Sequence, residues 1–175
     1  MSGRESDGRH PGGSSGLRRP VVAVTAVALG LATLSGCSFF HSKNDGRTVS
    51  ALSVKPGDCV VAPTAITTEV KDLTVVPCSQ PHQQEVYALA PYPLPAGTEK
   101  TAAYPGEAVL KAFADGACLG AFTAYVGTDY RDSSLFFTYL LPSARGWQAG
   151  QDRDVTCVIT TTGAKRTSSV KGSRL

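Results

Sequence analysis

The sequence predicts an α+β domain in which a small antiparallel sheet is covered on one face by one long helix. Three observations predict this fold: short runs rich in β-branched residues, one apolar stripe at helical spacing between them, and an even number of widely spaced cysteines after the first. Strands, then a helix, then further strands are typical of a sheet with its helix on one side. We expect the four later cysteines to form two disulfides.

The predicted strands are short segments of apolar and β-branched composition, which suits a pleated surface. The first is entered from the turn Pro56-Gly57-Asp58, and the others cover residues 67–78, 85–90, 134–141 and 154–162, with an edge strand over 168–172. Residues 143–150 are expected to form a short helical turn with Ser143 as its cap. Cys157 lies on the inward face of its strand, because side chains alternate along a strand.

The long helix is predicted to begin at Pro105-Gly106-Glu107 and to end at Gly127, since proline suits a first turn and glycine suits a helix end. Apolar residues from Leu110 to Tyr125 recur at helical spacing and form one continuous stripe. Cys118 lies in this stripe, so its sulfur is expected to point into the core.

The N-terminal part is predicted to be a signal peptide that ends at a lipid attachment site. Paired arginines, Arg18 and Arg19, precede an uncharged apolar stretch over 21–34, which is too short to span a bilayer. The run Leu34-Ser35-Gly36-Cys37 resembles a lipobox, and acylation of Cys37 with two chains such as palmitate would give a stable anchor. An uncleaved membrane anchor is the alternative. The paired arginines also permit twin-arginine export, but only the arginines match that signal, so the general secretory route is favoured.

These features divide the chain into a signal peptide with a polar n-region (1–36), the lipidated cysteine and a linker (37–51), and a folded domain (52–175). The expected location is the outer face of the plasma membrane. Four of the 17 basic and two of the 14 acidic residues precede Cys37, so the exported part carries a net charge of +1. This near-neutral charge gives no reason to expect nucleic acid as a partner.

The number and spacing of the cysteines are consistent with an exported protein. Outside the cytoplasm four widely spaced cysteines usually form two disulfides, whereas a zinc site needs close pairs that this sequence lacks. Four cysteines permit three pairings. Neighbouring strand segments favour Cys59–Cys78, and two inward-facing positions favour Cys118–Cys157.

The stretch Cys78-Ser79-Gln80-Pro81-His82-Gln83-Gln84-Glu85-Val86 is similar to the C-x-x-P-H-x-x-E-V run of the septum-formation domain family, exported or membrane-bound proteins of high-GC Gram-positive bacteria. Gly57-Asp58-Cys59, Tyr104-Pro105-Gly106 and the region from Trp147 to Cys157 match in the same order. The resemblance covers residues 54–172, with one additional residue at 150–153. It implies an envelope protein linked to division septa, and it implies no enzyme activity or cofactor.

His82 and Glu85 are the one obvious acid–base pair of the predicted domain, and His41 in the linker is the other histidine of the exported part. No G-x-S-x-G, S-x-x-K or H-E-x-x-H motif accompanies them, so no catalytic residue, metal or cofactor is predicted. We expect the pair to hold the bend after Cys78 through hydrogen bonds to each other or to nearby amides. Contact with a partner is the alternative role.

The predicted function is therefore that of a membrane-anchored, non-enzymatic module that binds cell-division or cell-wall proteins. Two alternatives remain at this point. One is a lipoprotein that binds a small ligand or the cell wall, and the other is an unrecognised hydrolase.

Overall fold

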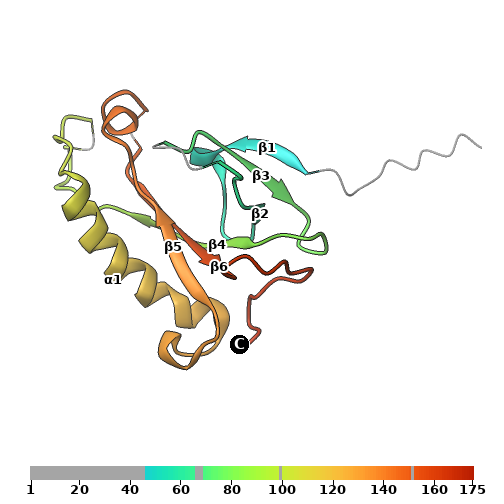
Figure 1. The fold of residues 1–175 in the computed structure, drawn as a ribbon. Coiled ribbons are helices and arrows are strands. Elements are labelled where there is room, and N and C mark those ends of the chain that lie inside the picture. The colour runs from blue at the N-terminus through green and yellow to red at the C-terminus, as the bar shows by residue number, and fades with distance from the viewer. Residues whose placement is uncertain (1–45, 66–68, 99, 151) are drawn as a thin grey trace, which may run out of the picture. The chain divides into compact units, whose positions relative to one another are not determined.

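The structure is a computed structural model that describes residues 46–65, 69–98, 100–150 and 152–175 (Figure 1). The predicted signal peptide, Cys37 and most of the predicted linker lie outside these residues. The described part contains a six-stranded sheet whose neighbouring strands are all antiparallel, and one long helix. The predicted α+β fold is therefore confirmed.

The order of elements follows the prediction closely, with the strands divided between the two sides of the helix. They are β1 (Arg47–Ser50), a 3-10 turn (Ala51–Ser53), β2 (Cys59–Val61), β3 (Asp72–Val76), β4 (Gln84–Pro91), α1 (Glu107–Val126), a second 3-10 turn (Tyr130–Asp132), β5 (Phe136–Leu140), a π-helical turn (Gly146–Gly150) and β6 (Asp154–Thr160). In the sheet the strand order is β1-β3-β2-β4-β6-β5. The longest strand, β4, thus joins the N-terminal strands to the C-terminal ones.

The helix α1 has the boundaries that its glycines predict. Gly127 adopts a left-handed conformation with a φ of 89°, and its N–H donates to the carbonyl of Thr123 at 2.9 Å. Glycine is favoured there because it has no Cβ to strain the backbone. The side chains that α1 buries belong to the predicted stripe and its last turn: Leu110, Ala114, Cys118, Phe122, Tyr125 and Val126.

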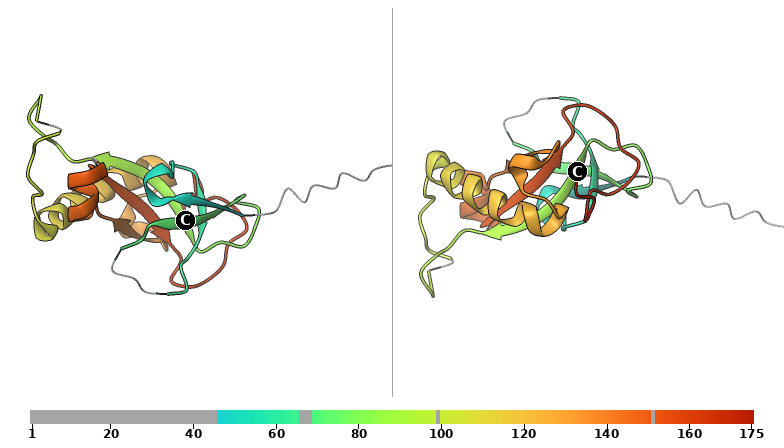
Figure 2. Two further views of the ribbon diagram at one scale, coloured as in Figure 1. Left: turned by 90° about the horizontal axis from the view of Figure 1, so that it is seen from above. Right: turned by 90° about the horizontal axis from the view of Figure 1, so that it is seen from below.

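Two hydrophobic clusters lie on opposite faces of the sheet. Alternate residues of β6 separate them, since Cys157 and Ile159 pack with α1 while Val158 between them packs with the other cluster. The second cluster forms where β1, β2 and β3 extend the sheet, and it consists of Val54, Val60, Leu73, Val75, Val86 and Val158. Figure 2 shows α1 beside the C-terminal strands and the N-terminal strands at the opposite end of the domain.

By length and composition α1 is apolar enough to cross a membrane, with a mean hydropathy of 1.3 over its best window, and no other helix of the described residues meets this test. However, Cys118 near its middle is disulfide-bonded to Cys157 of β6, and the face that carries Cys118 packs against the sheet. We therefore interpret α1 as the core helix of the domain.

Both predicted disulfides are present. Cys59 of β2 is joined to Cys78 in the turn after β3, with a Cα–Cα distance of 5.2 Å. Cys118 of α1 is joined to Cys157 of β6, with a Cα–Cα distance of 5.4 Å. The second bond fastens the helix to the sheet.

Two segments differ from the prediction. Residues 47–50, which the sequence places in the linker, form β1 and pair with β3. An edge strand of this kind is held by backbone hydrogen bonds and needs no apolar alternation that a sequence would reveal. Residues 168–172, predicted as an edge strand, form no strand, because the N–H of Val170 donates to the side chain of Glu85 instead of to a neighbouring strand.

Candidate functional site

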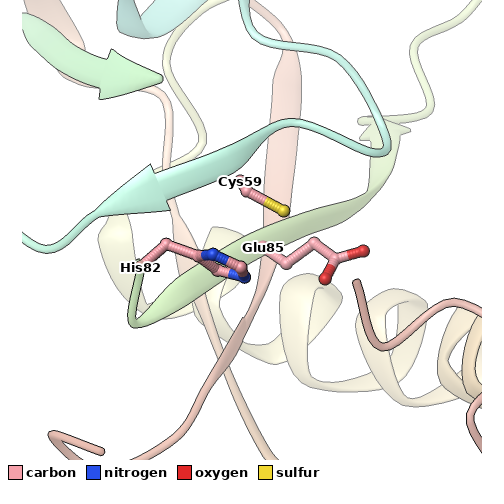
Figure 3. Close-up of side chains that lie close together, drawn as sticks. All are labelled: Cys59, His82 and Glu85. Atoms are coloured by element: carbon pink, nitrogen blue, oxygen red, sulfur yellow. The ribbon is translucent and has the colours of Figure 1, made fainter. Parts of the chain in front are cut away.

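The structure brings His82 and Glu85 together with a third residue, Cys59 (Figure 3). Cys59 lies directly opposite Glu85 in the pairing of β2 with β4, and His82 lies just before β4. One nitrogen, oxygen or sulfur atom of each side chain lies within 4.8 Å of the other two. All three residues are almost fully buried. The sequence predicts the first two as a pair, whereas the approach of Cys59 depends on strand register.

The carboxylate of Glu85 joins three parts of the domain. Its Oε1 accepts hydrogen bonds from the Tyr125 hydroxyl of α1 at 2.6 Å and from the Ser169 hydroxyl at 2.5 Å. Its Oε2 accepts a hydrogen bond from the backbone N–H of Val170 at 2.8 Å. In Figure 3 the carboxylate points away from His82. Of the two arrangements that the sequence leaves open, the bond between these side chains is replaced by bonds to residues far away in the sequence, one of which is to the backbone amide of Val170.

His82 is bound to the bend that precedes it. Its Nδ1 lies 2.7 Å from the carbonyl oxygen of Gln80, so Nδ1 carries a proton and donates it. The backbone of His82 forms an isolated antiparallel bridge with Arg166. The other ring nitrogen, Nε2, is buried and has no hydrogen-bond partner among the described residues. His82 therefore holds the bend with one nitrogen and leaves the second one unused.

The cluster is closed. The gap beside it, which His82, Glu85, Ile159, Thr161, Arg166 and Val170 help to line, has no room for a water molecule. Cys59 is half of a disulfide and offers no thiolate. The cluster therefore connects separate parts of the domain through the contacts of His82, Glu85 and Cys59.

Two buried tyrosines, Tyr87 and Tyr125, pack between the sheet and α1. Burial raises the pKa of Tyr125 well above its usual value of 10.0, and the hydrogen bond to Glu85 and the charge of that carboxylate raise it further. Burial likewise raises the pKa of Tyr87, whose hydroxyl donates to the carbonyl of Cys118 at 2.8 Å. Both hydroxyls therefore remain protonated donors at neutral and mildly alkaline pH.

A groove of about 780 Å³ lies elsewhere on the domain, and Cys59, His82 and Glu85 do not line it. It is bounded by the 3-10 turn after β1, the segment before β3, the middle of β4, the start of α1, the end of β5 and the start of β6. Pockets of this volume accommodate small ligands or the side chains of a bound peptide. Two leucines are exposed in its lining, Leu52 with 64% and Leu89 with 37% of their surface accessible.

The charges around the groove are unbalanced. Four acidic residues line it, Glu69, Glu107, Asp152 and Asp154, against the basic residues Lys71 and Arg153. The guanidinium of Arg153 stacks on Trp147, 3.9 Å from the ring centroid, and donates to the carbonyl of that residue at 2.6 Å. Burial raises the pKa of Asp152 above its usual value of 3.8. The groove therefore combines exposed leucines with an excess of carboxylates.

Fold and site together define a two-disulfide α+β domain in which a buried glutamate ties sheet, helix and C-terminal segment to one another. The sequence model of one family, described as septum formation, matches residues 56–174, and the chain belongs to this family. The match supports a septum-related extracytoplasmic role. Comparisons with curated proteins and with solved structures give no match.

Proposed function

We propose that the chain is a lipoprotein, anchored at Cys37 on the outer face of the plasma membrane, that acts at the division septum by binding a protein partner and not by catalysis. The observation that carries the binding role is the groove with its exposed leucines and acidic lining. The His82–Glu85 cluster supports the non-enzymatic part of the proposal, since it is sealed and its carboxylate is fully engaged.

The chemistry of the groove favours a particular occupant. Exposed Leu52 and Leu89 offer apolar surface that a partner would cover. Glu69 is ion-paired with Arg145 at 3.6 Å. The other three carboxylates still outnumber the two basic side chains of the lining and favour a cation over an anion, because complementary charges steer and orient association. We therefore propose that the occupant is a protein segment that presents an apolar side chain next to a basic one. A small neutral ligand would use the leucines but not the carboxylates.

The groove is tested by replacing both leucines with aspartate in the full chain, Leu52→Asp with Leu89→Asp, and following a fluorescent fusion in dividing cells. Leu52 and Leu89 together expose about as much surface as one whole leucine, so covering them contributes about 1.5–3 kcal/mol, and the double variant is expected to lose its septal position and to spread over the membrane. Leu119→Asp is the matched control, because Leu119 is 47% exposed on α1 and does not line the groove.

A cross-linking amino acid at position 52 should capture a partner segment with basic residues. Septal enrichment that persists in the double variant would contradict the proposal. Loss of that enrichment in Leu119→Asp as well would show that the groove is not the surface responsible.

Lipid anchoring is tested by the intact mass of membrane-extracted protein. We expect a chain that begins at Cys37 and carries the added mass of a diacylglyceryl group, since Leu34-Ser35-Gly36-Cys37 follows a short apolar stretch. In Cys37→Ser the sulfur is absent, and the added mass is expected to be lost. A wild-type chain that retains Met1 and has no acyl mass would exclude the proposed anchor.

A further inference from the structure

The two disulfides differ in the solvent exposure of their cysteines. Cys118 and Cys157 are both fully buried between α1 and β6. Cys59 is equally buried, but its partner Cys78 is partly exposed in the surface turn after β3, where Gln80 N–H donates to the Pro77 carbonyl at 2.8 Å. Of the four disulfide cysteines, Cys78 is the one with exposed surface, so an incoming thiolate would attack Cys78 Sγ and release Cys59 as the leaving thiolate.

The leaving sulfur lies in one cluster with His82 and Glu85, and the carboxylate of Glu85 already accepts hydrogen bonds from Tyr125, Ser169 and Val170. A ring nitrogen of His82 is within 4.8 Å of Cys59 Sγ, and Nε2 of the same ring is buried without a hydrogen bond among the described residues. A disulfide sulfur is a weak acceptor, whereas a thiolate is a charged one that a protonated imidazole stabilises. Reduction would thus give His82 Nε2 a hydrogen-bond partner, which the described part of the oxidised protein does not supply.

The exposed sulfur also has a partner ready for the reduced state. Cys78 Sγ lies 3.6 Å from the carbonyl oxygen of Gly57. A thiol can donate a hydrogen bond to that oxygen, and a disulfide sulfur has no hydrogen to donate. Both sulfurs of this pair therefore have a neighbour that is suited to the reduced form.

From these contacts we infer that Cys59–Cys78 is a thiol-exchange site, in which Cys78 accepts attack by an external dithiol and His82 stabilises the departing Cys59 thiolate. Cys118–Cys157 is the structural bond of the pair. The inference concerns the helix-covered face of the sheet and does not depend on the groove.

The proposed thiol–disulfide exchange takes place in two steps, through a mixed disulfide at Cys78. One thiolate of the dithiol attacks Cys78 Sγ and forms a mixed disulfide, while the Cys59–Cys78 bond breaks and its electron pair leaves on Cys59. The second thiolate of the dithiol attacks its own sulfur in the mixed disulfide and releases Cys78. The dithiol loses two electrons, the protein disulfide gains two, and the two protons of the dithiol end on Cys78 Sγ and His82 Nε2.

The test equilibrates the oxidised full chain with graded ratios of reduced and oxidised dithiothreitol, traps free thiols by alkylation, and maps both cysteine pairs by mass spectrometry. We expect Cys59–Cys78 to open while Cys118–Cys157 remains closed. In His82→Asn the amide can still donate to the Gln80 carbonyl, but the second ring nitrogen is gone. The equilibrium constant for opening is expected to fall at least tenfold, which corresponds to about 30 mV.

Tyr125→Phe is the matched control for a general loss of stability, because it removes a hydrogen bond to Glu85 and leaves His82 unchanged. It is expected to leave the equilibrium constant within twofold of the wild-type value. Simultaneous opening of both disulfides, or an unchanged constant in His82→Asn, would overturn the inference.

A second measurement covers the case in which His82→Asn fails to fold. Cys78→Ser leaves Cys59 as the free thiol of this pair, and the ultraviolet absorbance of a thiolate reports its ionisation. We expect this absorbance at neutral pH in Cys78→Ser and its loss when the chain is unfolded by denaturant at the same pH. Equal absorbance in the folded and unfolded chains would overturn the assignment of His82.

Discussion

Removal of the Cys118–Cys157 disulfide, by Cys118→Ala with Cys157→Ala, is expected to lower the free energy of unfolding by about 4 kcal/mol. The bond closes a loop with a sequence separation of 39 residues, and the loss of chain entropy in the unfolded state grows with loop length. Domains of this size have unfolding free energies of about 5–15 kcal/mol. The variant should therefore unfold at a much lower denaturant concentration under non-reducing conditions.

Removal of the other disulfide is expected to lower the free energy of unfolding by less. Cys59–Cys78 has a sequence separation of 19, so Cys59→Ala with Cys78→Ala is expected to cost about 3 kcal/mol. One end of this bond lies in a surface turn and not in the helix-covered core. A larger loss for this pair than for Cys118–Cys157 would show that α1 is held by side-chain packing more than by its covalent link.

Glu85→Ala is expected to destabilise the domain by about 3 kcal/mol or more. The substitution leaves the Tyr125 hydroxyl, the Ser169 hydroxyl and the Val170 N–H without their acceptor. Hydrogen bonds to a charged group contribute about 1.5–3 kcal/mol each, and a buried donor without a partner is costly. Equilibrium unfolding in denaturant measures the change.

Single partners of Glu85 give the matched controls. Tyr125→Phe removes one donor and keeps the ring, so it is expected to cost about 1.5 kcal/mol. The double variant with Glu85→Ala should cost little more than Glu85→Ala by itself, because the bond is already lost. Full additivity of the two changes would mean that Tyr125 contributes through its ring and not through its hydroxyl.

The helix and the disulfides are features that the sequence predicts well. The stripe from Leu110 to Tyr125 repeats within one element, so its spacing alone indicates the buried face. The position of Cys118 in this stripe and of Cys157 on the inner face of its strand then makes their pairing predictable. The local sequence pattern is sufficient in these cases, because the helix or strand that contains a residue determines which way its side chain points.

The partners of Glu85 and the groove are not predictable in this way. Glu85 is separated from Tyr125 by 40 residues and from Val170 by 85, and nothing in the sequence near either one records the contact. The groove draws its lining from six separate segments. The strand β1 is polar and is recognised through its backbone pairing with β3. Such features depend on register and topology, which single-sequence patterns do not encode.

The contacts of Glu85 also bear on when the domain can fold during synthesis. A ribosome delivers the chain from its N-terminus, so β4 emerges with its carboxylate long before Ser169 and Val170, which follow 84 and 85 residues later. Until those donors arrive, burying Glu85 against α1 leaves a charge without its full set of hydrogen bonds. We therefore expect α1 to complete its packing against Glu85 only after the segment that carries Ser169 and Val170 has been made.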